Sequence, residues 1–212
     1  MEKTTQYSEV FFPVHYDKIN SMDVCIRKPL VATVSADKTL KVWDYLFRVL
    51  EYNYPFNDEA FCVAFHPSGL HVVLGFADNI KIMNLFYKGN GSDPQTKDLK
   101  HISHKGYKEI RFSNGGHLFA VSSGTPQQKI FIYNFYTRES TSAVGYAGHT
   151  ARIRSLEWSK DDLYLYSCGM DGNLYEWTVY KPDDRNDIIT RNSNPTKGGS
   201  INSLCKPTEG RS

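Results

Sequence analysis

Two stretches of this chain repeat each other at a fixed offset of 134 residues, and this repeat constrains the fold more than any other feature. The alignment needs no gap. Six pairs of identical residues fall within the 29 positions from 15 to 43 and their counterparts: His15 and His149, Ile19 and Ile153, Ser21 and Ser155, Asp37 and Asp171, Leu40 and Leu174, and Trp43 and Trp177. We interpret the two stretches as copies of one structural unit.

Two weaker copies lie between them. The last strand of the unit recurs as "LKVWD" (40–44), "IKIMN" (80–84), "IFIYN" (130–134) and "LYEWT" (174–178). The tryptophan position is therefore occupied by Trp43, Met83, Tyr133 and Trp177, at spacings of 40, 50 and 44 residues. Alternating apolar residues favour strands, and Gly, Pro, Asn and Asp occupy the turns. A period of about 40–45 residues with several short strands is typical of the WD-repeat β-propeller blade.

We therefore predict an all-β WD-repeat propeller with four blades and the start of a fifth. Because a closed propeller of this family has about seven or eight blades, we expect the chain to be part of a longer protein. The predicted segments are a lead-in at 1–14, blades at 15–45, 56–86, 104–136 and 148–180, a polar loop at 181–200 and the beginning of a further blade at 201–212.

Two of the four copies retain residues that resemble the buried polar network of WD repeats. These residues are His15, Thr33, Asp37 and Trp43, and in the second copy His149, Ser167, Asp171 and Trp177. The resemblance implies that the aspartate holds the histidine, the histidine meets the hydroxyl, and the hydroxyl meets the indole N–H. An unpartnered buried polar atom costs about 1–3 kcal/mol, so we expect a structural role. The copies with Met83 and Tyr133 must depend more on packing.

No catalytic or metal-binding constellation competes with this interpretation. His, Asp and Ser together suggest a triad, but here they would lie inside a sheet without a pocket. The pairs His66 and His71, and His101 and His104, have no further ligand at metal-binding spacing, so we predict no metal and no cofactor. The stretch "SNGGH" (113–117) lacks the Lys-Ser/Thr of a phosphate loop and predicts a hairpin turn. We predict that the protein is not an enzyme.

Composition bears on two classes of partner. The chain has 212 residues and a net charge of +2, which gives no reason to expect nucleic acid or a membrane surface as the partner. No apolar stretch approaches the roughly 20 residues of a membrane helix. The first residues lack a secretory signal. Four widely separated cysteines fit a reduced compartment, and we expect Cys25, Cys62 and Cys168 to be small core residues.

More specific strings point to one family. They are "CIRKPL" (25–30), "HPSG" (66–69), "GFAD" (75–78), "MNL" (83–85), "FSNGGHLFA" (112–120), "GHT" (148–150), and "DG" followed by "YEW" (171–177). In this order they resemble the cilia- and flagella-associated protein 57 family of axonemal WD-repeat proteins, over residues 15–178. That family carries two propellers and a coiled coil, and this chain resembles the start of the second propeller. The 88–104 loop and the residues after 180 depart from the family pattern.

The resemblance implies a non-catalytic structural scaffold of the ciliary or flagellar axoneme. Such a protein would be microtubule-associated, would help place inner-arm dyneins on doublet microtubules and would thereby regulate motility. Its expected partners are doublet microtubules and subunits of the inner dynein arm or of a regulatory complex, within a large assembly. The alternative is a general cytosolic WD-repeat adaptor in a multiprotein complex. The residues that bind partners are not predicted; the 88–104 and 181–200 loops are candidates because of their length.

Overall fold

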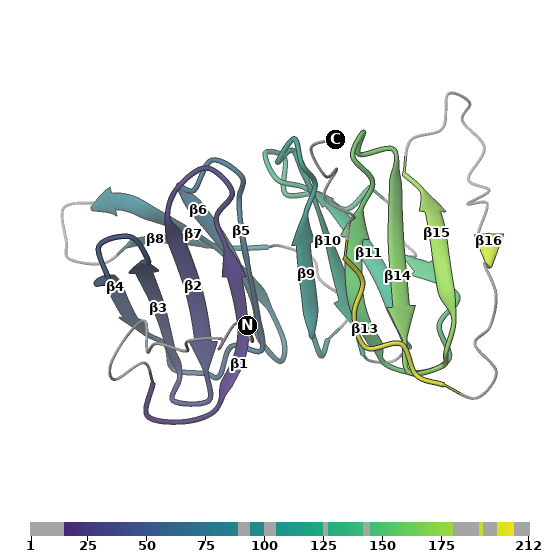
Figure 1. Cartoon of the computed structure of the whole chain (residues 1–212), viewed down its shortest axis with the longest axis horizontal. Coiled ribbons are helices and arrows are strands. Elements are labelled where there is room, and N and C mark those ends of the chain that lie inside the picture. The colour runs from purple at the N-terminus through teal and green to yellow at the C-terminus, as the bar shows by residue number, and fades with distance from the viewer. Residues whose placement is uncertain are drawn as a thin grey trace, which may run out of the picture.

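Every regular element in the described part of the chain is a β-strand. The computed structural model describes residues 15–88, 94–99, 105–124, 127–141, 145–179, 191–192 and 199–205. The strands form four antiparallel sheets of four strands each (Figure 1). The all-β propeller arrangement predicted from the repeat is therefore confirmed. The lead-in segment 1–14 lies outside the described residues, as do most of the 181–200 segment and residues 206–212.

Each sheet is a meander in which neighbours along the chain pair with each other. Sheet 1 contains β1 (Ile19–Val24), β2 (Leu30–Ser35), β3 (Thr39–Asp44) and β4 (Val49–Pro55). Sheet 2 contains β5 (Cys62–Phe65), β6 (His71–Gly75), β7 (Ile80–Lys88) and β8 (Pro94–Asp98). Sheet 3 contains β9 (Glu109–Phe112), β10 (Leu118–Ser123), β11 (Lys129–Asn134) and β12 (Tyr146–Ala147). Sheet 4 contains β13 (Ile153–Trp158), β14 (Tyr164–Gly169), β15 (Leu174–Thr178) and β16 (Arg191–Asn192).

The sheets stand side by side with their first strands adjacent. Strand β1 contacts β5, β5 contacts β9, and β9 contacts β13, so the first strand of each sheet lies closest to its neighbours (Figure 1). The fourth strands, β4, β8, β12 and β16, pair only with the third strand of their own sheet. This is the radial order of propeller blades, with the first strand of each blade near the axis and the fourth at the rim.

The apolar core consists of three clusters, each between two successive sheets. Apolar residues alternate along a strand toward one face, so a sheet can bury them only against a neighbour. The clusters include Val34 and Val72 for sheets 1 and 2, Val73 and Phe119 for sheets 2 and 3, and Ile132 and Leu165 for sheets 3 and 4. Cys25, Cys62 and Cys168 are buried thiols, as expected, and each is free.

The fourth strands correct the predicted segmentation. Strand β8 lies inside the 88–104 segment that was expected to be a loop, and β4 lies between the first two predicted blade ranges. These strands are at the edge of their sheets, and the side chains of β4 are mostly exposed. Without a buried face, an edge strand such as "PQTKD" carries little apolar alternation to reveal it.

Candidate functional site

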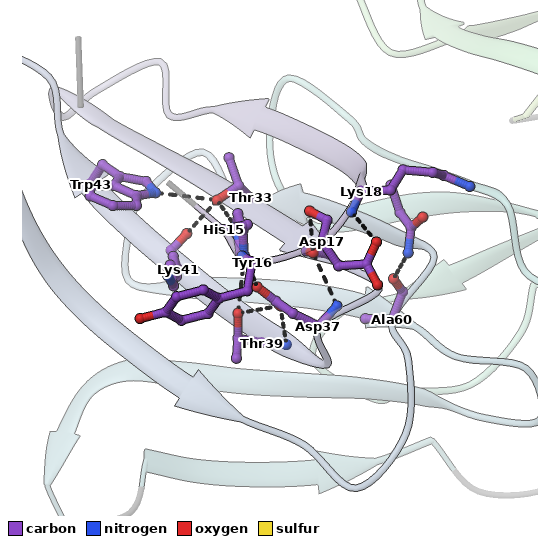
Figure 2. A network of polar contacts seen from close by, with 12 residues as sticks. His15, Tyr16, Asp17, Lys18, Thr33, Asp37, Thr39, Lys41, Trp43 and Ala60 are labelled. Atoms are coloured by element: carbon purple, nitrogen blue, oxygen red, sulfur yellow. Dashed lines mark hydrogen bonds and ion pairs between the residues drawn. The ribbon is translucent and has the colours of Figure 1, made fainter. Parts of the chain in front are cut away.

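The first four predicted network residues come together in sheet 1. His15 precedes β1, Thr33 lies in β2, Asp37 lies in the turn between β2 and β3, and Trp43 lies in β3 (Figure 2). The Nδ1 atom of His15 is 2.8 Å from Asp37 Oδ2, and its Nε2 atom is 2.8 Å from Thr33 Oγ1. The indole N–H of Trp43 donates to the same hydroxyl oxygen at 3.2 Å. The network thus links the segment before β1 to strands β2 and β3.

Asp37 also organises its own turn. Its carboxylate accepts hydrogen bonds from the backbone N–H groups of Tyr16 and Thr39, each at 3.0 Å, and from the Thr39 hydroxyl at 2.6 Å (Figure 2). Burial alone would raise the pKa of Asp37, but these donors and His15 outweigh it and hold the pKa well below its usual value. The carboxylate therefore stays ionised and fixes the turn that leads into β3.

The second network repeats the same geometry in sheet 4. His149 Nδ1 is 2.9 Å from Asp171 Oδ2, and His149 Nε2 is 2.8 Å from Ser167 Oγ. The Trp177 indole N–H donates to Ser167 Oγ at 2.8 Å. The Asp171 carboxylate also accepts the backbone N–H of Thr150 at 3.0 Å. The structure therefore brings together all four residues predicted for this copy.

The burial of these side chains bears on the catalytic alternative. Ser167 is completely buried, and Trp177 is 1% exposed and packs edge-on against Tyr146 of sheet 3. The serine oxygen accepts the indole N–H and contacts the histidine, so its hydrogen bonds are already made inside the protein. A nucleophile must reach a substrate atom, and this hydroxyl is closed off from solvent. The arrangement can hold strands together, but it offers no surface for acyl transfer.

Packing replaces the network in the two middle sheets. Met83, at the tryptophan position of sheet 2, is fully buried in the cluster between sheets 1 and 2. Tyr133, at the same position of sheet 3, stacks on Phe119 with ring centroids 5.5 Å apart. Both side chains belong to apolar clusters between successive sheets. At these two positions the side chains contribute apolar packing.

An ion-pair cluster near the axis was not predicted from the sequence. Arg111 of β9 places Nη1 3.2 Å from Asp23 Oδ1 of β1, and Nε 3.7 Å from Glu157 Oε2 of β13. Asp23 also accepts the backbone N–H of Phe65 in β5 at 2.7 Å. One guanidinium therefore links the first strands of three sheets. A signal was present, because Asp23 and Glu157 are acidic residues at equivalent positions of the 134-residue repeat.

The turns at one end of the sheets carry a second set of polar links. Asp162, in the turn between β13 and β14, accepts the backbone N–H groups of Asn114 at 2.8 Å and Gly115 at 2.7 Å. His66 Nε2 lies 3.0 Å from the carbonyl oxygen of Gly116. Gly116 has a φ of 77°, and a Cβ atom there would lie 2.7 Å from that same nitrogen. The "SNGGH" stretch is thus a hairpin turn between β9 and β10 that contacts both neighbouring sheets.

The histidine pairs do not form a metal centre in the described part of the chain. No group of three or more His, Cys, Asp or Glu side chains is placed there to hold a metal ion. Burial lowers the pKa of both His66 and His71, which keeps these rings neutral near pH 7. His101 and His104 lie outside the described residues. No helix among the described residues is long and apolar enough to span a bilayer.

Four meander sheets with buried His–Asp and Trp–hydroxyl networks define a WD40-repeat β-propeller. The family model described as WD domain, G-beta repeat matches residues 6–44 and 140–178, the two stretches that carry the networks. The chain is 45% identical over 167 residues to cilia- and flagella-associated protein 57 C of Tetrahymena thermophila, and 38% identical over 178 residues to cilia- and flagella-associated protein 57 of Mus musculus. The resemblance inferred from the sequence is thereby confirmed.

These matches cover most of this chain and a small part of the relatives. They include 78% of the chain for the Tetrahymena protein and 84% for the mouse protein, but the chain spans only 13% of the length of each. Echinoderm microtubule-associated protein-like 4 of Xenopus laevis is a more distant relative, 26% identical over 170 residues, which is 78% of the chain and 17% of that protein.

We predict that Asp171→Ala destabilises the chain by about 1–3 kcal/mol, because His149 Nδ1 and the Thr150 N–H lose their buried acceptor. Asp78→Ala is the matched control. Asp78 is 70% exposed and pairs only at the surface with Lys105, so its loss costs about 0–1 kcal/mol. Urea denaturation followed by tryptophan fluorescence measures both. Equal losses at the two sites would show that the sheet 4 network does not hold its strands.

A second prediction concerns Glu109 of β9. Burial raises its pKa to about 7, although Arg111, Arg152 and Arg154 oppose the shift. Between pH 4.5 and 7 the folded chain therefore binds more protons than the unfolded chain, and this residue's contribution to stability decreases as the pH rises. We expect Glu109→Gln to become progressively more stable relative to wild type from pH 5 to pH 8. Denaturation at several pH values tests this, and a constant difference contradicts it.

Proposed function

We propose that the chain is a propeller segment of a non-catalytic scaffold in the ciliary or flagellar axoneme. The observation that carries this proposal is the 45% identity to cilia- and flagella-associated protein 57 C over most of the chain. The geometry supports it, because the polar residues that resemble a catalytic set are closed inside sheet 4. What the fold presents to solvent is blade surface, which suits protein–protein contact.

The proposed partners are axonemal proteins within a large complex. These partners are the doublet microtubule and subunits of the inner dynein arm or of a regulatory complex. The protein would help to place inner-arm dyneins on the doublet microtubule and would thereby regulate motility. The similarity to a protein named as microtubule-associated supports a cytoskeletal partner class. The net charge of +2 supports neither nucleic acid nor a membrane surface as the principal partner.

We also propose a structural role for the two networks in this scaffold. Each network fixes three successive parts of one sheet through hydrogen bonds between 2.8 and 3.2 Å. Fully satisfied buried polar groups favour one strand arrangement over its alternatives. A scaffold needs this property, because its binding surfaces must keep a fixed geometry while the axoneme bends.

The experiment is to tag the endogenous protein and to extract isolated cilia with detergent. We expect the tagged protein to remain with the axoneme, alongside tubulin, while a soluble matrix marker is released. Deletion of the gene should then lower the amount of inner-arm dynein in the axoneme without changing the amount of tubulin. Blotting of both fractions measures these quantities.

The two parts of the proposal fail separately. Recovery of the protein in the detergent-soluble fraction would contradict the axonemal role and favour a cytosolic adaptor. Retention in the axoneme together with an unchanged content of inner-arm dynein would contradict the dynein role alone.

A further inference from the structure

A small cleft lies between sheets 2 and 3. Its volume is about 150 Å³. His71 of β6 and Asn84 of β7 belong to one wall, and these two residues are paired across the strands. Phe135, which follows β11, belongs to the other. The volume is below the roughly 300–1,000 Å³ of pockets for drug-sized ligands, so the cleft suits the end of one side chain.

The charged residues that line this cleft are all cations. Lys97 of β8 and Arg138, in the turn after β11, both line it and are exposed, and no carboxylate contributes to the lining. Among the described residues, neither of these two side chains forms an ion pair with Asp or Glu. Two cations at one cleft, neither paired with a carboxylate of the described residues, favour an anionic group there.

The same wall contains a buried polar atom. The Nδ1 atom of His71 is buried, and no hydrogen-bond partner for it exists within the described part of the chain. Burial, with Lys97 contributing, lowers the pKa of this ring, so near pH 7 it is a neutral group with hydrogen-bonding capacity unused. Unsatisfied groups of this kind are rare in folded proteins, and a bound ion, water or ligand group is one arrangement that satisfies them.

The turn that carries Arg138 is held in place. The side-chain oxygen of Asn134 accepts the backbone N–H groups of Tyr136 at 2.9 Å and Thr137 at 3.1 Å. The backbone N–H of Arg138 donates to the Asn134 carbonyl at 2.8 Å, and Arg138 has a φ of 63°. Tyr136, which is 68% exposed, also lines the cleft. Because the backbone of this turn is already fixed, binding of a partner at Tyr136 and Arg138 would cost little backbone conformational entropy.

We propose that this cleft binds an aspartate or glutamate side chain from an acidic segment of a partner protein. The carboxylate would lie between the Lys97 ammonium and the Arg138 guanidinium, and the adjoining partner residues would pack on Tyr136. A planar guanidinium suits a carboxylate, which it can bind with two N–H groups. The inference concerns the chemistry of the partner segment and stands whether or not the partner is axonemal.

The test is binding of a fluorescent glutamate-rich peptide to the full chain, followed by anisotropy at low and high salt. The matched peptide has glutamine in place of every glutamate. The variants are Lys97→Gln, Arg138→Gln and their combination. The matched control is Arg48→Gln, because Arg48 occupies the corresponding turn of sheet 1, is exposed and has a similar φ of 56°.

We expect the glutamate peptide to bind, with affinity that falls at high salt, and the glutamine peptide not to bind. Each single cleft variant should lower affinity by about threefold to fivefold and the double variant by about tenfold, whereas Arg48→Gln stays within about twofold. Equal effects of Arg48→Gln and Arg138→Gln, or no charge-dependent binding, would overturn the proposal. So would displacement of the peptide by inorganic phosphate at an equal concentration. Unchanged thermal midpoints of the variants exclude loss of folding as the cause.

Discussion

Each sheet of this protein has apolar residues that only the neighbouring sheet can cover, and the rest of the structure depends on this constraint. The three apolar clusters lie between successive sheets, so no sheet is a folding unit with a core of its own. At about 25 cal/mol per Å² of buried apolar surface, this packing is the principal favourable term. The polar links at the axis and at the turns then fix how the sheets are oriented.

The buried networks operate inside this apolar frame. Trp177 shows the connection, because its ring belongs to the cluster between sheets 3 and 4 while its N–H donates to Ser167. An indole at this position buries a large apolar area and needs one acceptor, which the network supplies. Where the chain has Met83 instead, no acceptor is needed and the apolar contact alone remains. Network and packing are therefore two solutions for the same position of the repeat.

The repeat made the four sheets and their turns predictable, because identities at a fixed offset reflect a shared local structure, and the resemblance to WD repeats implied the eight network residues. His15 and Asp37, for example, are 22 residues apart and meet as the resemblance implied. The edge strand β8 was missed because a polar strand without a buried face has no apolar alternation. Arg111 was missed because it meets Asp23 across 88 positions of sequence, a contact that depends on the curvature of the whole arrangement. The cleft between sheets 2 and 3 likewise exists only once both sheets are placed.

Whether stability comes from packing between sheets is tested most directly by comparing Leu165 of β14 with Leu163, which lies in the turn just before that strand. Leu165 is completely buried in the cluster between sheets 3 and 4, whereas Leu163, two positions earlier, is 43% exposed. Leu165→Ala is expected to lower the free energy of unfolding of the chain by about 2–5 kcal/mol. Leu163→Ala is expected to change it by no more than about 0.5 kcal/mol. Similar losses for both variants in urea denaturation would contradict the claim that packing between sheets stabilises the chain.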